Sequence, residues 1–454
     1  MVNAIIAKEE IRTTNAQKSF SFSPIRVGIS GCGGMMGPYH TEDLQSNPRI
    51  ATVAAVYDAR DVAIDVARTY GVPNAFFMEN LDVTKDQATF SRFLKTHKLT
   101  VISGPNNVHA PQAEAVFKTE DADKRFVYVE KPPANSLEGA IGLIVLDSKH
   151  PGQIGIVSQN RMWTMMLEAR QMIQEGVIGN MVRSQVEYEQ DWMGPDCPAY
   201  WRALKGIGGE LGHDDLGNLG KLVDIAYHAV DSLEFMTSRN VVTVRNAYIQ
   251  NVVKERKLPA GGGTFQKGGE ELRIPVGGDT QYHGDDVMDA VLELDNGAIV
   301  DLRVSQTNAG HKNMLRVRAY GNKGSLEFNT DNANDLVLYG YGNKAETITR
   351  DPGALTYLKN IAPWLREGLA MNNPPFRYFT PSKHDEGWRD VHRKQALAFA
   401  LYAQLVAQKE LSSDNRKDLF VVPTAQEALH VMQTLKAIYR TAANQKNYKK
   451  EVGK

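Results

Sequence analysis

The stretch VGISGCGGMMG, residues 27–37, constrains the fold of this chain more than any other segment. It overlaps an apolar strand pattern at 25–30, and four glycines then fall within seven residues. A glycine-rich turn between a strand and a helix lets backbone amides approach a phosphate, and the N-terminus of the helix attracts the negative charge. The segment therefore predicts a dinucleotide-binding turn.

The spacing of this turn departs from the usual G-x-G-x-x-G, because Met36 stands where the third glycine belongs and Gly37 follows one residue later. A tight turn without a ligand remains an alternative on the motif alone. Asp58, after a second strand pattern at 51–57, favours dinucleotide binding, since a carboxylate there can bind ribose hydroxyls and repel a 2′-phosphate. Arg60 could pair with that phosphate, so NAD is predicted as the cofactor and NADP is the less favoured choice.

Further strand patterns at 99–105 and 125–133 alternate with helix patterns, which favours a parallel sheet with helices on both faces. Ser136 directly precedes one of these helix patterns and can cap its N-terminus. We predict a flexible polar tail over residues 1–23 and a Rossmann domain over 24–154.

The pattern changes after residue 155. An amphipathic helix around Met165 and Met172 is followed by strand-like stretches with hairpin turns at DNG and GNKG. We predict a second, α+β domain over 155–454, with a large, mainly antiparallel open sheet and a C-terminal helix at about 423–443. Added loops are expected around 203–218 and 254–282.

Charge and cysteine content narrow the class of protein. Lys and Arg number 52 against 53 Asp and Glu, so nothing predicts nucleic acid as a partner. The 454 residues contain only two cysteines, which excludes a disulfide scaffold and favours a reducing compartment. No apolar run approaches the ~18 residues of a membrane span. A cytoplasmic protein without a membrane partner is the prediction.

Two places can carry chemistry. Lys131 lies near the end of the strand pattern at 125–133, and ligands of open α/β sheets bind at the carboxyl ends of the strands. A surface lysine after a strand is the plainer alternative. Asp224, His228 and Asp231 share one face of a predicted helix, where Asp224 could orient His228 as a base. That face could equally show polar side chains to water.

A metal site is not predicted. Asp224 and His228 are spaced as two ligands, but no cysteine or second histidine stands at a suitable spacing for zinc. The polar stretch at 212–218 is better explained as a loop.

Together these segments resemble the Gfo/Idh/MocA family of nicotinamide-dependent sugar and polyol oxidoreductases. The resemblance rests on the order and spacing of several motifs: RVGISGCGG with His40, SGPNNVHAPQAEAV, VEKPPANSLEGA, NRMWTMMLEARQMIQEGVIGNM with QDW, DIAYHAVD, LELDNGAIVDLRVSQTNAGHKN, AYGNKGSLEF and HDEGW. Ala226 departs from the family pattern, which usually has glycine at this point of the helix motif.

The resemblance implies the roles of individual residues. Lys131, Asp224 and His228 match the family's catalytic residues, and a cis bond often precedes the proline matched by Pro132. The predicted cofactor-binding residues are Gly31, Gly33, Gly34, Met35, Met36, Asp58, Arg60, Pro105, Asn106, His109, Glu130 and Lys131, and the predicted substrate-binding residues are Lys131, Arg161, Trp201, Arg202, Asp224 and His228.

The predicted function is an NAD-dependent transfer of hydride between a sugar, sugar derivative or cyclic polyol and nicotinamide, in a homodimer or homotetramer formed through the C-terminal sheet. One alternative is a glycoside-cleaving enzyme that oxidises its substrate transiently and then eliminates. A second is a regulator that binds nucleotide without catalysis, and a third is a structural subunit of an active partner. The presence of Lys131, Asp224 and His228 argues against the regulator.

Overall fold

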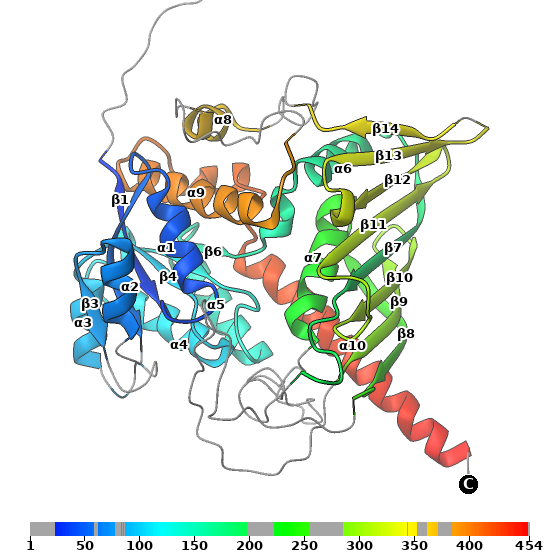
Figure 1. The fold of residues 1–454 in the computed structure, drawn as a ribbon, viewed down its shortest axis with the longest axis horizontal. Coiled ribbons are helices and arrows are strands. Elements are labelled where there is room, and N and C mark those ends of the chain that lie inside the picture. Colours follow the sequence, from blue (N-terminus) through cyan, green and yellow to red (C-terminus); the bar gives the residue numbers. More distant parts are fainter. Residues whose placement is uncertain are drawn as a thin grey trace, which may run out of the picture.

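The structure, a computed structural model, describes residues 23–58, 62–77, 83, 85, 87–197, 222–253, 285–342, 344–351, 361–370 and 384–452. Six parallel strands form its first sheet, in the order β3-β2-β1-β4-β5-β6 (Figure 1). The strands are β1 Ile25–Ser30, β2 Ala51–Asp58, β3 Ala75–Phe77, β4 Leu99–Ile102, β5 Phe126–Val129 and β6 Ile154–Ile156. This is the strand order of the Rossmann fold, so the predicted class of the N-terminal half is confirmed.

Helices cover both faces of this sheet, which explains why β4 and β5 are apolar and buried without alternation. The helices are α1 Gly37–Gln45, α2 Val62–Tyr70, α3 Gln87–Leu94, α4 Asn106–Phe117 and α5 Leu137–Lys149. The hydroxyl of Ser136 accepts a hydrogen bond from the Gly139 amide at 3.1 Å, so this serine caps α5 as predicted.

The second sheet has eight strands in the order β14-β13-β12-β11-β7-β10-β9-β8. They are β7 Met181–Glu189, β8 Val241–Gln250, β9 Val287–Leu294, β10 Ile299–Ser305, β11 Met314–Gly321, β12 Gly324–Asn329, β13 Asp335–Gly340 and β14 Glu346–Thr349. Only β7 and β10 pair in parallel, so the prediction of a mainly antiparallel sheet is confirmed. Gly297 forms the β9–β10 hairpin turn with a φ of 82°, a left-handed conformation that favours glycine.

Three helices pack on one face of this sheet: α6 Thr164–Gln174, α7 Val223–Thr237 and α10 Ala425–Val452 (Figure 1). Side chains of β7 alternate accordingly, with Val186 and Tyr188 buried toward the helices and Glu187 on the other face. Ion pairs between neighbouring strands line that outer face, among them Arg316 with Glu187. The helix α10 continues to Val452, beyond the predicted end at about 443.

The last part of the chain returns to the first sheet. The helix α9, Trp388–Ala407, packs against α1, β1 and β2, while α10 also contacts α5 and β6 (Figure 1). The remaining helix is α8, Pro363–Ala370. Because β6 ends at 156, the first sheet runs two residues past the predicted domain boundary at 154, and the boundary itself stays a prediction. No helix in the described ranges is long and apolar enough to cross a membrane.

Candidate active site

The glycine-rich turn connects β1 to α1. Gly31 has a φ of 77°, and a Cβ there would lie 2.4 Å from the backbone nitrogen of Gly104. A Cβ on Gly37 would lie 2.5 Å from the Cα of Cys32. Gly37 therefore allows α1 to pack closely on the turn, although Met36 has shifted it by one position.

Two helix N-termini open at this end of the parallel sheet. The N-cap residues of α1 and α4, Met36 and Pro105, provide no side-chain cap. The first amides of a helix have no partner within the helix, and together with its dipole they attract phosphate. The strand order reverses between β1 and β4, where dinucleotides bind in such sheets. These residues fit the pyrophosphate of a dinucleotide.

Asp58 lies at the end of β2 beside the turn. Its Oδ2 accepts a hydrogen bond from the Gly33 amide at 2.7 Å, and the residue is only 1% exposed. The carboxylate thus shapes the turn from inside, a role that the sequence did not suggest. Its predicted contact with ribose stays a prediction, and Arg60 lies outside the described residues. Met35, also predicted to bind the cofactor, is an exposed residue of the turn.

A second turn, after β5, carries Lys131. The peptide bond between Lys131 and Pro132 is cis, as the family resemblance implied. The buried ring of His109 joins this turn to the neighbouring loop, with Nδ1 at 2.8 Å from the Pro132 carbonyl oxygen and Nε2 at 2.9 Å from that of Gly104. His109 therefore ties the lysine turn to the end of β4, and the partly buried Asn106 begins α4 beside it.

The structure brings Lys131 and α7 together. The Lys131 Nζ donates to Oδ1 of Asp224 at 2.8 Å and to its carbonyl oxygen at 2.9 Å. Both side chains keep some exposure, 14% for the lysine and 18% for the aspartate. The ion pair thus joins the carboxyl end of the first sheet to the first turn of a helix that covers the second.

His228 follows one helical turn after Asp224 and is 3% exposed. Burial and the Lys131 cation lower the pKa of His228 to about 3, from 6.5, although the Asp224 carboxylate opposes them. Its Nδ1 has no hydrogen-bond partner in the described part of the chain. The predicted orientation of His228 by Asp224 therefore stays a prediction, while the imidazole is neutral and can accept a proton.

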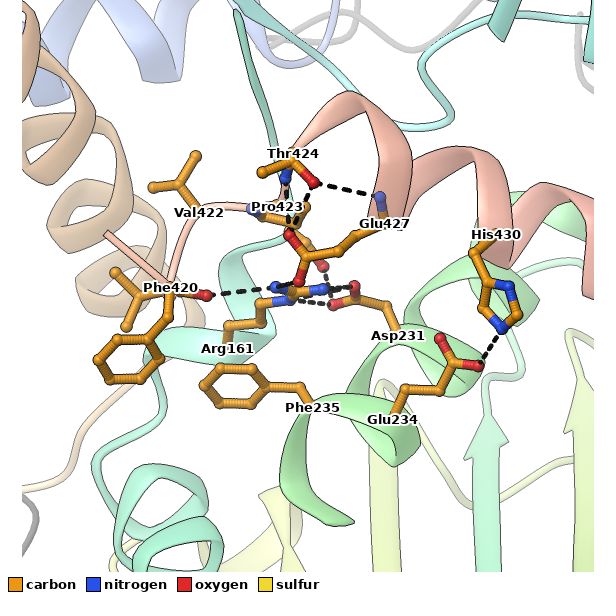
Figure 2. Close-up of polar contacts among 12 residues, drawn as sticks. Arg161, Asp231, Glu234, Phe235, Phe420, Val422, Pro423, Thr424, Glu427 and His430 are labelled. Carbon is orange, nitrogen blue, oxygen red and sulfur yellow. Dashed lines mark hydrogen bonds and ion pairs between the residues drawn. The ribbon is translucent and has the colours of Figure 1, made fainter. Parts of the chain in front are cut away.

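Asp231, the third polar residue on this face of α7, is fully buried against Arg161 (Figure 2). The Nη2 of Arg161 lies 2.6 Å from Asp231 Oδ1, while Nη1 reaches Glu427 Oε1 at 2.8 Å and donates to the Phe420 carbonyl at 3.2 Å. Burial acts to lower the pKa of Arg161, but Asp231 outweighs it and raises the pKa. Arg161 thus ties α7 to the start of α10, and this geometry gives no support to its predicted contact with a substrate.

These contacts exclude one of the two alternatives for α7. Since His228 and Asp231 are buried, their face of the helix does not show them to water, and that alternative is wrong. Trp201, Arg202 and the predicted loops at 203–218 and 254–282 lie outside the described residues.

A buried polar cluster lies behind the turn that carries Lys131, and the sequence singled out only some of its residues. Glu130, whose predicted contact with the cofactor stays a prediction, lies with His40 and His392, and all three offer ligand atoms within 4.8 Å of one another. Within the described ranges this is the one group with the spacing of a metal site. His40 Nε2 and Glu130 Oε1 are 2.8 Å apart, a hydrogen-bond distance. The sequence signal for His392 was weak, because it stands one turn beyond the quoted HDEGW motif.

Comparisons with known proteins agree with this geometry. Residues 25–156 match the model of an oxidoreductase family with an NAD-binding Rossmann fold, and residues 166–327 match the model of the GFO/IDH/MocA C-terminal domain. Levoglucosan dehydrogenase of Pseudarthrobacter phenanthrenivorans is 28% identical over 337 residues, 71% of this chain and 78% of the relative. The galactose/lactose metabolism regulatory protein GAL80 of Saccharomyces cerevisiae is 23% identical over 241 residues, 52% of each protein.

Among solved structures, a levoglucosan dehydrogenase in complex with NADH and levoglucosan has a TM-score of 0.68 at 22% identity. The match covers 93% of this chain and 98% of that one. At this identity the likeness concerns the fold.

Replacement of Asp58 should alter cofactor choice. Asp58→Asn keeps an acceptor for the Gly33 amide but removes the charge, so discrimination against NADP should weaken by about 10-fold or more, as expected for loss of one charge-assisted contact. Asp58→Ala should also lower the affinity for NAD, because the turn loses its inner support. Titrations of both cofactors measure the two effects, with Asp65→Ala, an exposed acid on α2, as the control. An unchanged ratio of the two affinities in both Asp58 variants would contradict the assignment.

The depressed pKa of His228 predicts a dependence of stability on pH. The unfolded chain takes up a proton on this histidine below pH 6.5 and the folded chain does not, so the wild type should lose stability relative to His228→Asn as the pH falls. The difference in unfolding free energy should change by about 1 kcal/mol per pH unit between roughly pH 6 and 4. Urea titrations at several pH values measure it, and a pH-independent difference would show that His228 titrates normally.

Proposed function

Since the chain belongs to the Gfo/Idh/MocA family of oxidoreductases with an NAD-binding Rossmann fold, we propose that it oxidises a hydroxyl-bearing carbon of a sugar, sugar derivative or cyclic polyol. The membership confirms the predicted family and NAD as the cofactor. The observation that carries the proposal is the Lys131–Asp224 ion pair beside the buried, neutral His228. Similarity to a levoglucosan dehydrogenase supports a carbohydrate as the substrate.

The charges of the site suit removal of a proton from a hydroxyl group. The Lys131 ammonium, whose charge Asp224 balances, can donate a hydrogen bond to the substrate oxygen and stabilise negative charge that develops there. His228 has a vacant lone pair for the hydroxyl proton, and the Asp224 carboxylate, which opposes the lowering of its pKa, would stabilise the imidazolium that forms. NAD, when bound, supplies the acceptor for the hydride that leaves the same carbon.

The uncapped N-termini of α1 and α4 and the turn at Gly31 would hold the dinucleotide phosphates. Asp58 would face the adenosine ribose from the end of β2. The lysine turn lies at the carboxyl end of β5 in the same sheet, and His109 ties it to the end of β4, so the reacting groups border the same crevice.

Assembly and location form a further part of the proposal. A homodimer or homotetramer would use the outer face of the eight-stranded sheet, which has a depression of about 510 Å³ bordered by Tyr248, Asp289 and Arg303. A cytoplasmic location is supported by Cys32 and Cys197, which form no disulfide.

Removal of the catalytic groups should reduce turnover while NAD still binds. General acid–base groups contribute about 10²–10⁴-fold, so Lys131→Ala and His228→Ala should each lower kcat by that range. Asp224→Asn should cost less, since it retains an acceptor for Lys131, and the losses should not be additive because the three residues act on one oxygen. The matched control is Lys149→Ala, at an exposed lysine on α5. Near-normal oxidation by His228→Ala, with unchanged melting and NAD affinity, would remove this histidine from the mechanism.

The substrate class is tested by NADH formation over a panel of sugars, anhydrosugars, inositols and glycosides, with product analysis. A dehydrogenase produces one NADH for each oxidised molecule. Cleaved glycoside without net NADH would identify the eliminating enzyme, and NAD binding without turnover of any compound would favour a regulator, the activity of the GAL80 relative.

A further inference from the structure

Four buried, ionisable side chains lie in contact behind the catalytic lysine. His40 and Asp43 come from α1, Glu130 from the turn after β5, and His392 from α9, and none is more than 5% exposed. His392 Nδ1 lies 2.6 Å from Asp43 Oδ2, and its Nε2 lies 3.8 Å from Glu130 Oε1. The same Glu130 oxygen is 2.8 Å from His40 Nε2.

The charges within this cluster follow from its contacts. Burial acts to lower the pKa of His392, but the hydrogen bond to Asp43 and the nearby Glu130 outweigh it and raise the pKa above 6.5. Burial acts to raise the pKa of Glu130, but His392 and His40 hold that pKa well below its usual value. Burial and the His392 cation lower the pKa of His40. These contacts therefore favour the charged form of His392, which lies between the two carboxylates, and the neutral form of His40 beside them.

The cluster is anchored in α9. Besides His392, Asp43 is held by Arg389 Nη2 at 3.0 Å and by Arg393 Nε at 3.3 Å, both on Oδ1. The Arg389 guanidinium also lies over the ring of Tyr39, 4.1 Å from its centroid. Since α9 is nearly 350 residues from Asp43 in sequence, these contacts fix α1 to a helix from the far end of the chain.

Glu130 connects this anchored cluster to the active site. While Oε1 faces the two histidines, Oε2 accepts a hydrogen bond from the backbone amide of Lys131 at 3.1 Å. The Lys131 side chain then reaches Asp224 at 2.8 Å. An unbroken series of contacts thus runs from α9 through a carboxylate to the main chain of the lysine.

We propose that His392 is a positioning residue for the reaction: from α9 it holds Glu130, and through Glu130 it fixes the backbone from which Lys131 reaches the substrate oxygen. The inference rests on the proposed function of Lys131. Misplacement of a catalytic group by about 1 Å can cost about 10²-fold in rate, so a contact that touches neither substrate nor cofactor can still set kcat. His40 contacts the same carboxylate oxygen as His392.

Two replacements of His392 separate its two contacts. Both replacements remove the charge, but His392→Gln places an amide near the position of Nε2, which lies 3.8 Å from Glu130, whereas His392→Asn keeps a donor only for Asp43. We expect kcat to fall about 10- to 100-fold in His392→Asn, with partial rescue in His392→Gln and no change in the KM for NAD. If His392 contributes to stability alone, both variants should have a lower melting temperature, but kcat should not fall while the KM for NAD stays unchanged.

The pH profile gives a second readout. Asp43, Glu130, His40, Arg389 and Arg393 face His392, and its raised pKa means that the imidazolium persists above pH 6.5 and loses its proton as the pH rises through the folded value. Wild-type kcat should fall on the alkaline side of pH 6.5, and this limb should be missing from both His392 variants. An alkaline limb that is retained unchanged in His392→Asn would overturn the proposal.

The control is His430→Asn. His430 Nε2 lies 3.0 Å from Glu234 Oε1, a second histidine–glutamate pair between α10 and α7 (Figure 2). Its loss removes an ion pair between helices without touching Glu130, so kcat should not change. Should the His392 variants fail to fold, Glu130→Gln tests the same step, because it keeps the shape and removes the charge, and full kcat in this folded variant would contradict the inference.

Three outcomes distinguish failure of the proposed function, failure of the positioning role and the presence of a metal site. Full activity of Lys131→Ala would overturn the proposed function, whereas an inactive Lys131→Ala enzyme with normal kcat in His392→Asn would overturn only the positioning role. Metal analysis should find no stoichiometric zinc, and one zinc per chain that is lost in His392→Asn would replace the hydrogen-bonded cluster with a metal site.

Discussion

The ion pair between Lys131 and Asp224 is the contact on which the site depends, because it joins the two halves of the chain at the place where chemistry is expected. The lysine stands at the carboxyl end of a parallel strand and the aspartate in the first turn of a helix on the second sheet. A buried pair of this kind is costly unless its geometry is good. Here both side chains keep partial exposure, so a substrate hydroxyl can join the pair without the burial of a new charge.

The sequence predicted the parts of this arrangement that have local causes. Apolar strands and the glycine turn identified the Rossmann half, and the DNG and GNKG turns identified two hairpins of the second sheet. The spacing of Asp224 and His228 placed both on one face of α7. The glycine-rich turn tolerates its departure from the usual motif. Gly37 packs closely against the backbone of Cys32, which a residue with a side chain, such as Met36, could not do.

What the sequence could not provide depends on contacts between distant segments. Nothing in the sequence indicated that Asp231 and Glu427 would bind the guanidinium of Arg161. Nothing near His392 in sequence indicated that it would meet Asp43 and Glu130. The strands β13 and β14, the last two at one side of the second sheet, were missed, as was the full length of α10, because these segments lack a strong apolar period. These roles come from contacts between segments that are distant in sequence, and the order of neighbouring residues does not indicate such contacts.

The central claim is that Lys131 and His228 act on one hydroxyl oxygen. The most direct measurement is a crystal structure with NADH and the sugar or polyol that the enzyme turns over. We expect the Lys131 Nζ and a ring nitrogen of His228 to lie within about 2.6–3.2 Å of the same substrate oxygen, on the carbon that faces the nicotinamide. A substrate whose reacting oxygen contacts neither residue, with Lys131 still paired to Asp224 alone, would contradict it.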